Sequence, residues 1–233
     1  MITNGKSAKY NHMTPPGSII KPPPKDPDWL KPFLAHCHRR RYPAKIDFIH
    51  PGDASDSIFL LLEGQVTVLI EDEDGREIIL SYLNKGEFIG EMGMFIPQPT
   101  RSVMVRTRSP CELAEISYAK LEGLFQNELR AHTKEILYAI GRQLTERLVA
   151  TSQKVGHLAF LDVTGRIAGT LLELCKQPDA MTHPDGMQIR ITRQEIGRIV
   201  GCSREMAGRV LKDLEERGLI SVSGKTIVVF GTR

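Results

Sequence analysis

Hydrophobic and polar residues alternate along the first half of the chain, between Ala44 and Ile116. Within this part, Val66, Val68 and Ile70 occupy every second position. Dipeptides that favour turns interrupt the pattern at short intervals: Pro51-Gly52, Glu63-Gly64, Asp74-Gly75 and Lys85-Gly86. A period of two residues between turn signals predicts antiparallel strands. Many short strands in succession are typical of a β-sandwich, a jelly roll or a barrel.

The period changes to that of a long helix over residues 132–159. Residues four and three positions apart form one stripe along it: Leu137, Gly141, Leu144, Leu148, Thr151, Val155 and Leu158. A heptad stripe kept over three repeats predicts that two helices wind around each other, so we expect a parallel homodimer. Gly141 and Thr151 are poor core residues, and an ordinary amphipathic helix packed on its own domain is the alternative.

A helix-turn-helix is predicted between Thr192 and Leu214. Thr192 followed by Glu195 predicts a capping box at the start of the first helix. Gly201 falls where the turn requires a left-handed backbone, and Ser203 can cap the second helix. Apolar residues that can pack the two helices together lie at Ile196, Val200, Ala207, Val210 and Leu211. The hairpin predicted over residues 219–230 would add a wing.

The front of the second helix carries side chains that suit DNA. Arg204, Glu205 and Arg209 are predicted to be exposed there, and Glu205 and Arg209 can brace each other one turn apart. Arginine pairs with guanine through two hydrogen bonds, and a carboxylate accepts a hydrogen bond from cytosine. Side chains near the two helix starts suit phosphate contacts: Thr192, Arg193, Gln194 and Ser203. A winged helix used for contact with another protein is the alternative.

An anion site is predicted between Gly86 and Ser102. Glycines at positions 86, 90 and 93 allow close approach of a backbone, and a helical turn starting at Glu91 would aim N–H groups at an anion. Arg101 and Ser102 can bind one phosphate. Glu91 would repel an anion unless it accepts a hydrogen bond from a ribose hydroxyl. The pattern favours a nucleoside monophosphate as the ligand. The alternative is that the same residues form only glycine turns and a surface Arg–Glu pair.

Charge is unevenly distributed along the 233 residues. The net charge is +3, and residues 163–233 carry all of it, with 11 Lys and Arg against 8 Asp and Glu. This excess favours a polyanionic partner for the C-terminal third. Residues 1–27 hold six prolines and few apolar side chains, which predicts a flexible tail.

Several other classes of protein are disfavoured. The longest aliphatic or aromatic run, Ile58 to Leu62, is far shorter than the roughly 18 residues of a membrane span, and no secretory leader is evident, so we expect a cytoplasmic protein. The four cysteines are scattered, so we expect reduced thiols and no metal. An iron–sulfur sensor would need more cysteines near Cys37. A metal oxygenase would need further histidines between His50 and His132, where there are none.

Long strings of the sequence resemble a known family. GEFIGEMGMF, AFLDVTGRIA, QPDAMTHPDGMQIRITRQEIGRIVGCSRE and GKTIVVFGTR are similar to segments of the cyclic AMP receptor protein (catabolite activator protein) family. The resemblance runs from about Leu34 to Arg233. It implies an α+β fold, with a cyclic-nucleotide-binding β jelly roll over 28–131 and a dimerisation helix over 132–159. A hinge at 160–163 and a winged helix-turn-helix over 164–233 would follow.

The resemblance also implies a function, that of a cyclic AMP-responsive homodimeric transcription regulator that is not an enzyme. The positions that match its cyclic AMP contacts are Gly90, Glu91, Met92, Arg101, Ser102, Arg147, Thr151 and Ser152, the last reaching from the partner subunit. Arg204, Glu205 and Arg209 match the base-reading residues, which implies palindromic double-stranded DNA resembling two TGTGA half-sites. The loop 178–186, and His38, Arg40 and Lys120, match surfaces that contact RNA polymerase. A regulator that is constitutive or responds to another nucleotide is the alternative.

Overall fold

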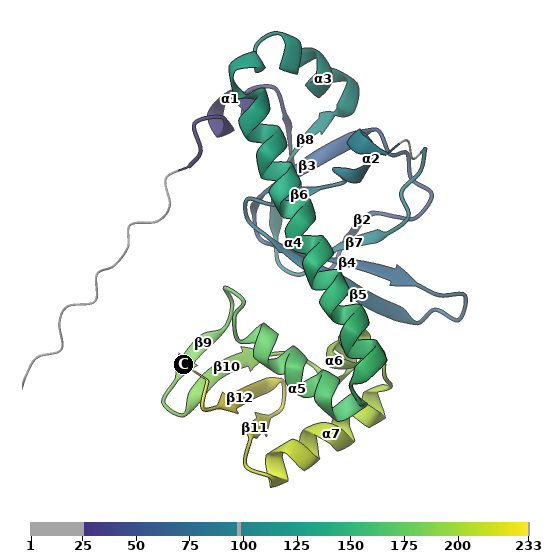
Figure 1. Cartoon of the computed structure of the whole chain (residues 1–233), viewed down its shortest axis with the longest axis vertical. Helices are drawn as coiled ribbons and strands as arrows, with labels where there is room; N and C mark the ends of the chain where they lie inside the picture. Colours follow the sequence, from purple (N-terminus) through teal and green to yellow (C-terminus); the bar gives the residue numbers. More distant parts are fainter. Residues whose placement is uncertain (1–25, 97–98, 233) are drawn as a thin grey trace, which may run out of the picture.

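The computed structural model describes residues 26–96 and 99–232, so the tail predicted for residues 1–27 lies almost wholly outside the described residues. A larger β domain and a smaller C-terminal domain lie one above the other (Figure 1). A long helix, α4 (Thr133–Phe160), runs down the β domain and ends beside the second domain. This arrangement confirms the α+β fold.

The β domain is a sandwich of two four-stranded antiparallel sheets. One sheet has the order β1-β8-β3-β6, comprising His38–Tyr42, Cys111–Ser117, Ser57–Glu63 and Phe88–Ile89. The other has the order β2-β7-β4-β5, comprising Asp47–Ile49, Met104–Thr107, Gln65–Glu71 and Glu77–Asn84. The turn predicted at Asp74-Gly75 lies between β4 and β5, where Gly75 has a φ of +75°.

The sheet that contains β3 is buried on both faces. Phe59 and Leu61 pack into a core shared with the second sheet, and Ile58 and Leu60 pack into a second core under the helices. Successive side chains of a strand point to opposite faces, so a strand covered on both sides reads as a continuous apolar run. This explains the run from Ile58 to Leu62.

Helices cover the outer face of that sheet. They are α1 (Leu30–Leu34), α3 (Tyr118–Gln126), a short 3-10 turn (Arg130–His132) and the first half of α4. The buried side chains of α4 are Ile136, Ile140 and Gln143. They pack beside the heptad stripe and not on it, so most of the predicted seam stays uncovered within one chain. Leu148, Val155 and Leu158 are 67%, 60% and 50% exposed.

The C-terminal domain contains the predicted helix-turn-helix. Its elements are α5 (Val163–Leu174), β9 (Met181–His183), β10 (Gly186–Arg190), α6 (Arg193–Val200), α7 (Arg204–Glu216), β11 (Ile220–Ser223) and β12 (Thr226–Phe230). Gly201 ends α6 in the left-handed conformation, with a φ of +70°. Ser203 caps α7 by accepting a hydrogen bond from the Met206 N–H at 3.1 Å. The predicted wing is the hairpin of β11 and β12.

The capping box predicted at Thr192 forms only in part. The Thr192 hydroxyl accepts a hydrogen bond from the Glu195 N–H at 3.1 Å, as expected. The Glu195 carboxylate points instead at the β domain, where it accepts a hydrogen bond from the Tyr82 hydroxyl at 2.9 Å and pairs with Arg108 at 3.3 Å. The Glu195 carboxylate, which would complete the capping box, therefore forms a contact between the two domains.

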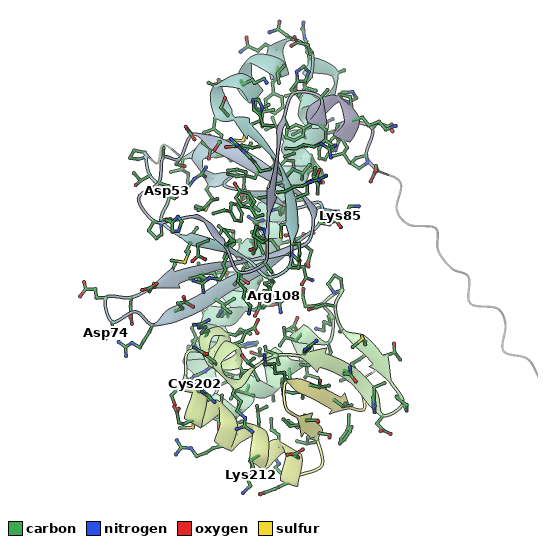
Figure 2. All side chains as sticks on the ribbon, turned by 180° about the vertical axis from the view of Figure 1, so that it is seen from behind. Asp53, Asp74, Lys85, Arg108, Cys202 and Lys212 are labelled. Atoms are coloured by element: carbon green, nitrogen blue, oxygen red, sulfur yellow. The ribbon has the colours of Figure 1, made fainter. Side chains whose placement is uncertain are left out.

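The contact between α6 and β5 is polar along its length. The Arg198 guanidinium lies 3.0 Å from the Glu77 carboxylate, and the Arg108 guanidinium lies over the Tyr82 ring, 4.4 Å from its centre. Arg108 lies at the junction of the two domains (Figure 2). Burial and the nearby Glu195 carboxylate raise the pKa of Tyr82, so its hydroxyl remains a hydrogen-bond donor at neutral pH.

We predict that Glu195→Ala lowers the free energy of unfolding by about 1–3 kcal/mol, because it removes a charged acceptor from Tyr82 and the nearer of the two carboxylates that pair with Arg108, the other being Asp179. Urea unfolding of the full chain measures this loss. The matched control is Glu216→Ala, which removes an exposed carboxylate 3.6 Å from Lys212 and should change stability by less than about 0.5 kcal/mol. Equal losses in the two variants would mean that the domain contact contributes nothing to stability.

Candidate nucleotide and DNA sites

The predicted anion site lies where β6 leads through Gly90 and Glu91 into the short helix α2 (Met92–Phe95). Gly90 has a φ of +82°. A Cβ atom at this position would overlap the Arg101 guanidinium and lie 3.1 Å from the Ser57 carbonyl oxygen. Glycine is therefore required here both by the backbone conformation and by the space that Arg101 occupies.

Arg101 is buried, at 8% exposure, and its guanidinium contacts only neutral acceptors. Nη2 donates to the Ser57 carbonyl at 2.5 Å, and Nη1 donates to the Gly90 carbonyl at 3.3 Å and to the Tyr118 hydroxyl at 3.1 Å. Across residues 26–96 and 99–232, no carboxylate forms an ion pair with it. A buried charge without a counter-ion is unfavourable, so this site favours an incoming anion.

Glu91 is buried too, at 2% exposure, and its partner is a residue of α4. Its Oε1 atom accepts a hydrogen bond from Arg147 Nη1 at 2.5 Å, while its Oε2 atom has no partner. An unpaired buried acceptor beside a buried cation suits a ligand that brings a hydroxyl donor next to an anion. Glu91 and Arg101 therefore do not form the surface Arg–Glu pair that was the alternative interpretation.

The structure brings Gly90, Glu91, Arg101 and Arg147 together and leaves the other predicted contacts at the margin. Met92 is 47% exposed on α2, and Ser102 is exposed beside Arg101. Thr151 and Ser152 are exposed on α4, one turn beyond Arg147. Both lie on the part of α4 where the heptad stripe is uncovered.

Two side chains at this site, the half-buried Tyr118 and the buried Gln143, were missed by sequence reasoning. The Tyr118 hydroxyl donates to the Gly90 carbonyl and accepts from Arg101. The Gln143 side chain contacts the backbone of Phe88. Tyr118 lies 28 positions from Gly90 and Gln143 lies 55 positions from Phe88, so no local spacing could have indicated either contact.

The side chains of α7 that were predicted to read bases are exposed. Arg204, Glu205 and Arg209 are all exposed, and α7 lies on the outer surface of the C-terminal domain (Figure 2). The predicted bracing of Glu205 by Arg209 is not formed, since Arg209 contacts the Met206 sulfur at 3.7 Å. Hydrogen bonds from the Glu205 N–H and Ser203, with the two arginines nearby, lower the pKa of Glu205, which keeps it ionised.

The residues predicted to contact phosphate divide into two groups. Arg193 and Gln194 are exposed in the first turn of α6. Thr192 and Ser203 use their hydroxyl oxygens to cap α6 and α7. A capping hydroxyl still has its own proton to donate, so the capping role of Thr192 is compatible with a phosphate contact, whereas Ser203 already donates to Glu205.

A nucleotide-type anion site in a β sandwich, joined by a long helix to a winged helix-turn-helix, defines a DNA-binding transcription regulator with a cyclic-nucleotide-binding domain. Residues 39–128 match the family described as cyclic nucleotide-binding domain, and residues 189–220 match the bacterial regulatory proteins of the crp family. The chain belongs to the CRP family of transcription regulators.

Individual relatives are similar over almost their whole length. The cAMP-activated global transcriptional regulator Vfr of Pseudomonas aeruginosa is 62% identical over 207 residues, which is 88% of this chain and 94% of that protein. The cAMP-activated global transcriptional regulator CRP of Salmonella typhimurium is 57% identical over 92% of this chain and 100% of its own length. A solved structure of the c-di-GMP-responsive global regulator CLP of Xanthomonas campestris matches with a TM-score of 0.83 and 54% identity, over 87% of this chain and 98% of that chain.

Two other features are absent from the described residues. None of their helices combines the length and the apolar character that crossing a bilayer requires. Among these same residues, no group of three or more His, Cys, Asp or Glu side chains is placed to hold a metal ion.

We predict that Glu91→Ala lowers the free energy of unfolding by about 3 kcal/mol, because it leaves the Arg147 cation without its buried partner. Urea unfolding of Glu91→Ala, Arg147→Met and the double variant forms a complete cycle. The double variant should be less destabilised than the sum of the two single variants. Strict additivity would mean that the contact between Glu91 and Arg147 is not stabilising.

Proposed function

We propose that the protein is a homodimeric transcription regulator that responds to cyclic AMP. The observation that carries this proposal is the buried Arg101 guanidinium, which pairs with no carboxylate among the described residues and donates to the carbonyl of Gly90; the next residue, Glu91, has an unpaired Oε2 atom. A cyclic nucleotide offers a partner for each of these groups: a phosphate anion for Arg101 and a ribose hydroxyl for Glu91. The relatives Vfr and CRP are both named as cAMP-activated regulators, which supports this choice.

The ligand would be held by residues of the β domain and of helix α4. Arg101 and Ser102 would bind the phosphate beside the backbone of Gly90, Glu91 would accept from the ribose hydroxyl, and Met92 would line the pocket. Arg147 would hold Glu91 in place from α4. The base would be reached by Thr151 and by Ser152 of the partner subunit, because both positions lie on the uncovered part of α4.

The dimer would form along α4. Leu148, Val155 and Leu158 are at least half exposed and share one heptad stripe. Exposed leucines and valines at this spacing are buried when a second copy of the helix packs against the first. A stripe that includes Thr151 brings the ligand site and the subunit interface to the same part of the helix.

Cyclic AMP would act by shifting a population of conformations. A ligand that contacts both the β domain and α4 favours the dimer arrangement in which those contacts exist together. Two recognition helices must lie about 34–36 Å apart to enter successive major grooves of a palindrome. Without ligand, the binding that remains would be weak, dominated by phosphate contacts and sensitive to salt.

The same proposal includes contacts with RNA polymerase in the cytoplasm. The loop 178–186 would form one contact surface. The second would comprise His38, Arg40 and Lys120, which lie at the β1 end of the sandwich; there Arg40 pairs with Glu115 at 2.8 Å and Lys120 donates to the His36 carbonyl at 2.7 Å.

We predict that Arg101→Leu abolishes the response of DNA binding to cyclic AMP while the chain still folds, because the phosphate loses its only buried cationic partner in the described pocket. Titration of a labelled palindromic duplex carrying two TGTGA half-sites measures this response. The titration is done without nucleotide and then separately with cyclic AMP, with cyclic GMP and with c-di-GMP. Arg41→Leu is the matched control, since Arg41 is 82% exposed on β1. Wild-type binding that cyclic AMP does not change would contradict the proposal.

The alternative is a regulator that is constitutive or responds to another nucleotide. It is favoured by the structural similarity to CLP, which is described as responsive to c-di-GMP. The same titration distinguishes the three cases: stimulation by cyclic AMP, a change caused by c-di-GMP, or equal binding under all conditions.

We predict that Glu205→Ala relaxes discrimination at one base pair of each half-site, at a cost of about 1–3 kcal/mol against the preferred sequence. A carboxylate accepts from cytosine N4, so its loss should affect that position alone. Competition among duplexes that differ at one base pair gives the measurement, and Glu216→Ala serves as the control. An equal loss on every duplex would assign Glu205 a structural role.

A further inference from the structure

Strand β6 has one edge that no other strand covers. It is the last strand of the sheet β1-β8-β3-β6, and it pairs with β3 through Leu60 and Phe88. Its other edge faces α4, and Phe88 is buried at 2% exposure. A buried backbone N–H and C=O on such an edge must find partners other than water.

Gln143 supplies both partners. Its Oε1 atom accepts from the Phe88 N–H at 2.8 Å, and its Nε2 atom donates to the Phe88 carbonyl at 2.8 Å. The side chain of Gln143 is itself buried, at 7% exposure. One amide thus takes the place of a neighbouring strand. It links the middle of α4 to strand β6, directly before Gly90 and Glu91.

Arg147 reaches the same segment from the next turn of α4. Its Nη2 atom donates to the Phe88 carbonyl at 2.6 Å, and its Nη1 atom donates to Glu91. Residues four apart lie on the same face of a helix, so Gln143 and Arg147 contact the segment 88–91 from one side. The two contacts differ in what they hold. Gln143 binds only the backbone of Phe88, at both its N–H and its carbonyl, whereas Arg147 binds the Phe88 carbonyl and also the Glu91 side chain.

We propose that Gln143 is the positioning residue that transmits movement of the nucleotide-binding segment 88–91 to α4. This inference rests on the proposed function, in which a cyclic nucleotide contacts Gly90 and Glu91. Arg147 holds Glu91, and Gln143 holds the backbone that carries it, so a shift of this backbone moves α4 with it. Without Gln143, the nucleotide still binds, but α4 keeps its unliganded position.

The experiment compares nucleotide binding with its effect on DNA binding in Gln143→Leu. Trp29, the only tryptophan of the chain, stacks on the Phe88 ring with centroids 5.9 Å apart, so its fluorescence reports cyclic AMP binding at this segment. We expect the dissociation constant for cyclic AMP to change by less than about threefold. The enhancement of palindromic DNA binding by cyclic AMP should fall by about tenfold or more, a loss of the size found for typical coupling between sites. DNA binding without nucleotide should be unchanged.

Two further variants keep the result interpretable. Gln126→Leu makes the same chemical change at an exposed position of α3 and should behave as the wild type. Gln143→Glu retains an oxygen to accept from the Phe88 N–H but loses the donor to the carbonyl, so its coupling should lie between those of the wild type and Gln143→Leu. It replaces Gln143→Leu if thermal unfolding shows that the leucine variant does not fold.

Each outcome has one meaning. Full DNA enhancement in Gln143→Leu, or in Gln143→Glu where that variant replaces it, overturns this inference and leaves the proposed function standing. Loss of cyclic AMP binding from a folded Gln143→Leu also overturns it, because the residue would then belong to the binding site itself. A wild-type chain whose Trp29 emission and DNA binding both ignore cyclic AMP overturns the proposed function and this inference together.

Discussion

The carbonyl of Phe88 accepts hydrogen bonds from two side chains of α4, and several parts of the structure depend on that contact. The contact satisfies a sheet edge that no strand pairs with, it anchors a 28-residue helix, and it lies three residues before Glu91. Buried backbone groups must be satisfied, so the helix cannot move away from the sheet without replacing these bonds. The segment 88–91 and helix α4 are therefore linked by hydrogen bonds that the fold itself requires, independently of a ligand.

The contact between the domains is of a different kind. It consists of charged and polar groups, chiefly Glu195 with Arg108 and Arg198 with Glu77. Polar contacts between domains permit relative motion, because water can replace the partners of these groups when the domains separate. The β domain thus holds α4 firmly and α6 loosely. A regulator that repositions its DNA-binding domain requires this difference in stiffness.

The elements that were predictable from the sequence are those whose signals are local. The period of two residues, the heptad stripe, Gly201 and Ser203 each act within a few positions, and the strands and helices were predicted from them. The partner of Glu91 was not predictable by these rules, because Arg147 lies 56 positions away and is brought close only when α4 packs on the sheet. Glu195 shows the same limit, since a tertiary contact takes the carboxylate that the local motif would have used.

The resting arrangement of Arg101 has a consequence for selectivity. Its guanidinium already has three neutral acceptors, so any incoming anion must exchange hydrogen bonds and not simply add them. A weakly basic anion, or one such as chloride that has a single accepting atom, would gain little from that exchange. A molecule that offers several oxygens, together with a hydroxyl for Glu91, recovers every bond it displaces. At the proposed nucleotide site, these existing hydrogen bonds would therefore favour a ligand with several oxygens over small inorganic anions.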